Sequence, residues 1–113
     1  MNKKELADHL HNSKYNCAQA VLLAFADEIG EDKEVLFRIS EGFGFGAGCG
    51  EGICGALSGA IMLAGLKNSD GNLEAPETKA STYKIAKEMK EKFVAKTGGL
   101  ICKDLKGLDG GKV

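Results

Sequence analysis

The sequence has almost no net charge and no apolar run long enough to cross a membrane. Its 15 lysines and arginines are balanced by 16 aspartates and glutamates, which gives a formal net charge of -1. Because nucleic-acid binding depends mainly on neutralising phosphates with basic residues, this balance argues against a nucleic-acid partner. The longest stretch poor in charge, 42–66, begins with closely spaced glycines, and its apolar second half is shorter than the ~20 residues that span a bilayer. We therefore expect no membrane insertion.

Signals for secretion, haem attachment and phosphate binding are also missing. Residues 1–11 lack the apolar segment and cleavage site of a secretory signal, so we expect a cytoplasmic protein. His9 and His11 have no Cys-x-x-Cys-His sequence around them and are expected on the surface, and no Lys-Ser/Thr follows the glycines. Neither haem nor a nucleotide is therefore expected. In a reducing compartment, the four cysteines are expected to be thiols, metal ligands or a working redox pair rather than structural disulfides.

The apolar periodicity predicts an all-α fold, a compact bundle of about five helices that forms one domain over residues 1–113. Three helices are predicted before residue 42, and their expected N-caps are Asn2, Asn16 and Asp32. Gly30 is expected to end the second helix. In the third helix, the spacing predicts a buried stripe made of Val35, Leu36 and Ile39.

A glycine-rich loop is predicted before a central buried helix. Six of the residues in 42–52 are glycine, which opposes a helix and favours a tight loop where backbone approaches backbone or a ligand. Residues 53–66 then read as a helix that is apolar on nearly every face. Gly55 and Gly59 share one side of it and would let another helix pack very close. A last amphipathic helix is predicted over 77–96, with Pro76 at its first position.

The four cysteines share a position, since each is placed at or just before the predicted start of a helix. A helix N-terminus presents unpaired N–H groups and the positive end of its dipole, which favours thiolates and anionic metal clusters. Four such starts that converge would form one site. The residues concerned are Cys17, Cys49, Cys54 and Cys102.

The chemistry of such a site is left open by the spacing alone. Cys49 and Cys54 are separated by four residues, a spacing also used by plant-type iron–sulfur proteins. Structural zinc is less natural, because no second cysteine pair or histidine pair accompanies them. A free cysteine is also often simply a small buried hydrophobic residue, and this alternative applies to each of the four.

Several segments together resemble the C_GCAxxG_C_C family, which is named for redox activity. They are Asn16-Cys17-Ala18-Gln19-Ala20-Val21, Gly42-Phe43-Gly44, Cys54-Gly55-Ala56-Leu57-Ser58-Gly59 and the later Cys102. The resemblance implies a small helical bacterial protein that is redox-active through its cysteines. Similar cysteine arrangements in split-Soret cytochromes are associated with an iron–sulfur centre, so the resemblance also implies a cluster. Family members commonly carry a further cysteine in a C-terminal extension; Cys49 either takes its place or is additional.

Three hypotheses follow. The first is an electron-transfer protein, with an unknown redox partner, in which Cys17, Cys49, Cys54 and Cys102 ligate a two-iron (2Fe–2S) cluster or another thiophilic metal. The second is a metal-free thiol–disulfide oxidoreductase with Cys49 and Cys54 as its catalytic pair. The third is a helical binding or assembly module with structural cysteines, in which the Gly55 and Gly59 face packs a partner or the second copy of a homodimer.

Overall fold

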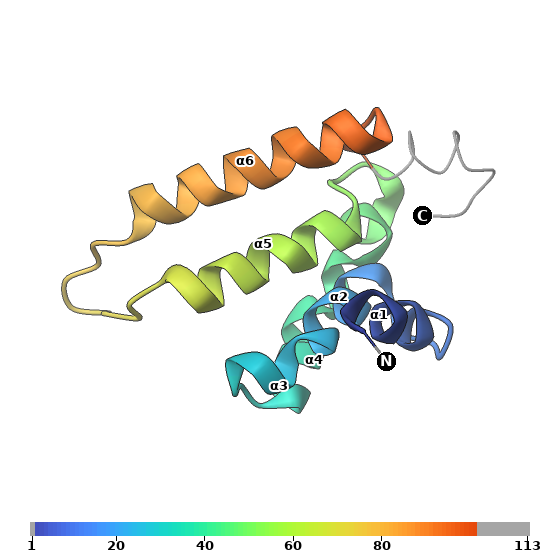
Figure 1. Cartoon of the computed structure of the whole chain (residues 1–113), viewed down its shortest axis with the longest axis horizontal. Coiled ribbons are helices and arrows are strands. Elements are labelled where there is room, and N and C mark those ends of the chain that lie inside the picture. The colour runs from blue at the N-terminus through green and yellow to red at the C-terminus, as the bar shows by residue number, and fades with distance from the viewer. Residues whose placement is uncertain (1, 102–113) are drawn as a thin grey trace.

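The chain begins with two short helices joined by a tight turn. In the computed structural model, which describes residues 2–101, α1 spans Lys3–His11 and α2 spans Cys17–Ala24 (Figure 1). Asn2 and Asn16 cap these helices as predicted, since each side chain accepts a hydrogen bond from a backbone N–H of the first turn. The side chain of Gln19 also accepts a hydrogen bond from the N–H of Asn16. This reciprocal capping box fixes the start of α2 at Cys17.

The second predicted helix is divided in two. Phe25 interrupts it, and Ala26–Ile29 forms a separate short helix, α3, which ends at Gly30 in the left-handed conformation with φ 67°. Gly30 therefore stops the helix as predicted. The division at Phe25 was not predicted, because the apolar spacing continues across it.

The next helix, α4, spans Lys33–Ser40 and begins after its predicted cap, Asp32. The buried stripe predicted for it is wrong in two of its three positions. Leu36 is 2% exposed, but Val35 is 50% exposed and Ile39 is 53% exposed. Since α4 packs mainly against α2, only a narrow side of α4 is covered.

The predicted glycine loop is present and turns tightly. It contains a single 3₁₀ turn, η1 over Glu41–Phe43, and a wide turn, η2 over Gly46–Gly50. The N–H groups of Glu51 and Gly52 both donate to the carbonyl of Gly46, which closes the wide turn. Within residues 45–50 only Cys49 has an ordinary negative φ, so the segment is folded back on itself rather than helical.

The central helix, α5, spans Gly55–Asn68 and crosses directly over α2. A Cβ atom added to Gly59 would lie 2.8 Å from the carbonyl oxygen of Ala18, so the missing side chains do permit the close helix approach that was predicted. The helix that uses this face is α2 of the same chain. The third hypothesis is therefore wrong about the Gly55 and Gly59 face, which is already covered; a homodimer through another surface stays a prediction.

The last helix, α6, spans Lys79–Thr97 and runs back along α5 as the second arm of a helical hairpin (Figure 1). It begins after Pro76 and Glu77, so the prediction that Pro76 occupies its first position is wrong. It ends at Gly98, which has the left-handed conformation that commonly stops a helix. None of its residues is buried, because it packs mainly on one side of α5.

The predicted all-α class is confirmed. Residues 2–101 contain six α-helices, and their only strand-like pairing is an isolated antiparallel bridge between Ile53 and Ile101. The core lies where α2, α3, α4 and α5 meet and is formed by Leu22, Ala26, Leu36 and Leu63. Over the same residues, none of the helices combines the length and the apolar character needed to cross a bilayer.

Candidate functional site

Two of the predicted site cysteines lie at the starts of the two helices that cross. Cys17 is the first residue of α2, directly after its cap, and Cys54 occupies the cap position of α5. Both placements were predicted from the sequence. Cys54 is 2% exposed, whereas Cys17 is only partly buried. Cys54 is not part of a disulfide.

The crossing brings these two positions together. Gly55 follows Cys54, and a Cβ atom added to it would lie 3.2 Å from the Cβ of Cys17 and 3.1 Å from the backbone nitrogen of Ala18. The first turns of α2 and α5 are therefore in direct contact, without a side chain between them. Since the N-terminal end of each helix dipole is positive, two such ends meet beside the two sulfur-bearing residues.

Asn16 connects the start of α2 to the glycine loop. Its side-chain amide donates a hydrogen bond of 2.8 Å to the carbonyl oxygen of Glu41, where the loop begins. Gly44 packs directly on the Asn16 side chain, and no room is left for a Cβ atom there. Gln19, which is 3% exposed, holds α4 by donating to the carbonyl oxygen of Phe37. The Asn-Cys-Ala-Gln segment thus fixes Cys17 relative to the loop and α4.

The end of the described chain lies beside Cys54. The N–H of Cys54 donates to the carbonyl oxygen of Leu100 at 3.0 Å, and Ile53 pairs with Ile101. These contacts join the start of α5 to the segment that follows α6. Cys102, the fourth predicted site residue, comes next in the sequence and lies outside the described residues.

Cys49 differs from the other two described cysteines. It lies inside the turn η2 rather than at the start of an α-helix, so its predicted placement is wrong. Its side chain is exposed, and its Sγ lies 3.5 Å from the carbonyl oxygen of Gly46 within the same turn. Glu51, beside it in the loop, is also exposed.

A histidine that the sequence assigned only to the surface contacts Cys17. The Nε2 atom of His11 lies 3.5 Å from the Cys17 Sγ, within hydrogen-bond distance for sulfur. His11 is the last residue of α1, and the N–H groups of Ser13 and Tyr15 both donate to the Leu10 carbonyl, which turns the chain back to α2. The sequence carries a signal for this contact, because only a short segment separates His11 from Asn16, the predicted cap of the helix that begins with Cys17.

The described residues do not provide a complete metal-ligand set. Over residues 2–101, no three side chains of the Cys, His, Asp and Glu types are close enough together to hold a metal ion. A 2Fe–2S cluster usually takes four cysteine ligands. The described donors alone therefore do not fit a cluster, and one would require Cys102.

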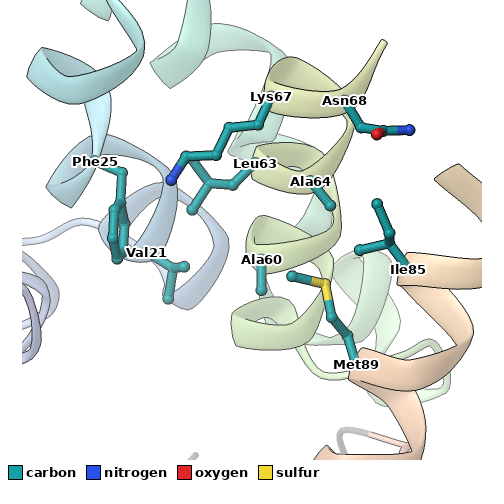
Figure 2. Close-up of a pocket in the computed structure, with 9 residues that line it drawn as sticks. All are labelled: Val21, Phe25, Ala60, Leu63, Ala64, Lys67, Asn68, Ile85 and Met89. Atoms are coloured by element: carbon teal, nitrogen blue, oxygen red, sulfur yellow. The ribbon is translucent and has the colours of Figure 1, made fainter.

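A separate apolar groove lies between α2, α5 and α6, with a volume of about 430 Å³ (Figure 2). Lys67 reaches from α5 across it toward Phe25, and its Nζ lies 5.8 Å from the centre of the Phe25 ring. Of the described residues that line the groove, none is a cysteine: Val21, Phe25, Ala60, Leu63, Ala64, Lys67, Asn68, Ile85 and Met89. This groove is therefore distinct from the site at Cys17 and Cys54.

Fold and site together define a small helical protein with cysteines at the crossing of two helix starts. The family model described as "Putative redox-active protein (C_GCAxxG_C_C)" matches residues 15–112, and the chain belongs to this family. No curated protein and no solved structure matches the chain significantly. The match confirms the family expected from the sequence motifs. It includes all four cysteines but begins after His11.

Proposed function

We propose that this redox-family protein works by thiol–disulfide exchange, with Cys17 and Cys54 as the reacting pair. The observation that supports the proposal is the direct contact between the starts of α2 and α5, where Gly55 leaves the Cys54 segment against Cys17. In the reduced form both sulfurs are thiols. Oxidation joins them in one disulfide and releases two electrons and two protons to an oxidant.

The pairing proposed here replaces Cys49 by Cys17 as the partner of Cys54. Cys49 is exposed in the turn η2 and its sulfur is engaged with Gly46 in the same turn. Cys17, in contrast, belongs to the helix that packs against the start of α5. We place the reaction in the cytoplasm, where reductants would return the disulfide to the dithiol.

The proposal is tested by mapping the disulfide that forms on mild oxidation. Trypsin leaves Cys49 and Cys54 on one peptide, so a second cleavage after Glu51 is needed to separate them. The expected product links the Cys17 peptide to the Cys54 peptide, and thiol counting should show two thiols lost per chain. Cys49→Ser should leave this reversible oxidation unchanged, whereas Cys17→Ser and Cys54→Ser should each abolish it. A dominant Cys49–Cys54 or Cys17–Cys102 link would contradict the proposed pair.

The cluster hypothesis is the alternative, with Cys17, Cys49, Cys54 and Cys102 as ligands of a 2Fe–2S cluster or another thiophilic metal. The contact of Cys54 with Leu100 favours it, because it joins the helix start to the segment before Cys102. Iron and acid-labile sulfide measured on anaerobically purified protein decide between the two. Stoichiometric iron and sulfide that disappear in Cys54→Ser would replace the exchange proposal by the cluster.

A further inference from the structure

The two thiols of the proposed pair differ in their access to solvent. Cys54 is 2% exposed at the start of α5, whereas Cys17 is partly exposed. A sulfur that attacks an external disulfide must reach it, but a sulfur that attacks the resulting mixed disulfide has to reach only its neighbour. The partial exposure of Cys17 therefore suits it to attack the external disulfide, and the burial of Cys54 suits it to attack the mixed disulfide on Cys17.

The sulfur of Cys17 also lies next to an imidazole that can accept its proton. Its Sγ lies 3.5 Å from the Nε2 of His11, which is exposed at the end of α1. The sulfur of Cys49, which is exposed, contacts a backbone carbonyl instead. An imidazole next to a thiol can take its proton and so activate it as a nucleophile. Because His11 precedes the residues that match the family model, this contact is a property of the chain's own N-terminal helix.

We propose that Cys17 is the attacking thiol, Cys54 the resolving thiol and His11 the proton acceptor in the reduction of low-molecular-weight disulfides. This assignment rests on the exchange function proposed above. A small disulfide suits the site, because Cys17 is only partly exposed beside the end of α1 and a bulky protein disulfide would reach it less readily.

The reaction proceeds in two exchange steps. The proton of the Cys17 thiol passes to the His11 Nε2, and the Cys17 sulfur attacks one sulfur of the substrate. The substrate S–S bond breaks, a mixed disulfide forms on Cys17, and the leaving thiolate takes the proton from His11. The Cys54 thiol then attacks the Cys17 sulfur, forms the Cys17–Cys54 disulfide and releases the second substrate half as a thiol. One substrate disulfide gains two electrons and two protons, and the protein dithiol loses them.

The test uses the full chain with Cys49→Ser, which removes the exposed thiol outside the pair. Reduced protein is mixed with oxidised glutathione, quenched with acid and analysed by peptide mass spectrometry. Adding Cys54→Ser should trap the glutathione adduct on Cys17 at a yield at least about tenfold above that of the parent. Serine is a favourable helix cap, so this variant should fold. With Cys17→Ser instead, adduct formation on Cys54 should be at least about tenfold slower than on Cys17 in the Cys54→Ser protein.

The role of His11 is tested by His11→Gln, with His9→Gln as the matched control on the same helix. His11→Gln should slow adduct formation on Cys17 by about tenfold, while His9→Gln leaves the rate unchanged. The melting temperature of His11→Gln and the rate at which Cys54 resolves the mixed disulfide should both stay unchanged. This result would show that His11 acts in proton transfer and does not only support the structure. Equal rates in the two histidine variants would overturn the role of His11.

Other results overturn the order of attack. Rapid adduct formation on Cys54 in Cys17→Ser would reverse the roles, and a Cys17 adduct that resolves as fast in Cys54→Ser as in the parent would exclude Cys54 as the resolving thiol. If the expected adducts form but the parent never yields a Cys17–Cys54 disulfide, the proposed exchange function is wrong. The assignment of Cys17 as the attacking thiol is then still supported.

Discussion

Two helices pack against α5 in different ways: α2 crosses it closely, and α6 runs along it with a looser contact. At the crossing, backbone meets backbone through Gly55 and Gly59, and Ala18 is fully buried. Along α6, which is the longest helix, none of the residues is buried, and an open apolar groove separates Ile85 and Met89 from α2 (Figure 2). The thiol pair lies at the close crossing. The comparison indicates that the closest helix packing lies where the proposed chemistry requires two sulfurs to meet.

The largest expected effect comes from the core beneath the crossing. Leu22→Ala removes a fully buried side chain from the cluster with Ala26, Leu36 and Leu63, and should lower the free energy of unfolding by about 2–5 kcal/mol. Ile85→Ala on α6 is the matched comparison and should cost about 1 kcal/mol, because its side chain is only partly buried. Urea denaturation measures both. Equal losses would mean that α6 is held as firmly as α2.

A smaller effect is expected when the helix crossing is forced apart. In Gly59→Ala the new Cβ would lie 2.8 Å from the Ala18 carbonyl oxygen, so α2 must shift and the free energy of unfolding should fall by about 1–3 kcal/mol. Gly65→Ala is the control on the same helix, since nothing lies within 4 Å of its added Cβ. It should raise stability by about 0.5–1 kcal/mol through helix propensity. Thermal unfolding of the two variants should therefore shift in opposite directions.

The next effect concerns the cap that positions Cys17. Asn16→Ala removes the cap of α2 and the bond to Glu41, and should cost about 1–2 kcal/mol. Asn2→Ala removes only the cap of the exposed helix α1 and should cost about 0.5 kcal/mol. Chemical denaturation gives the two values. An Asn16→Ala protein as stable as Asn2→Ala would show that the bond to Glu41 contributes nothing.

The smallest effect is expected far from both regions. Lys33 and Asp27 form an ion pair of 3.1 Å, but their side chains are 62% and 81% exposed. Because water and salt screen such a pair, Lys33→Ala should change the free energy of unfolding by less than about 0.5 kcal/mol. A loss above 1 kcal/mol, measured at low and at high salt, would contradict this estimate.

Local signals in the sequence predicted much of the framework. Asn2, Asn16 and Asp32 cap helices because capping depends on residues only two or three positions away. The burial of α4 was predicted less well, because exposure of Val35 and Ile39 depends on which neighbour covers that side of the helix. The break at Phe25 was not predicted, because the apolar spacing continues across it.

For the candidate site, the sequence by itself determined which residues carry sulfur, that Cys17 and Cys54 begin helices, and that Gly55 and Gly59 leave one helix face bare. These features are local, since they depend on capping and on the helical repeat. Only the tertiary structure decided that α2 of the same chain fills the bare face, that the start of α5 touches Cys17, and that His11 reaches its sulfur. The two helix contacts join residues separated by many positions, and they form only where buried area and chain geometry make the helices cross. The contact of His11 with Cys17 spans only a short turn, but it depends on how that turn brings the end of α1 to the start of α2.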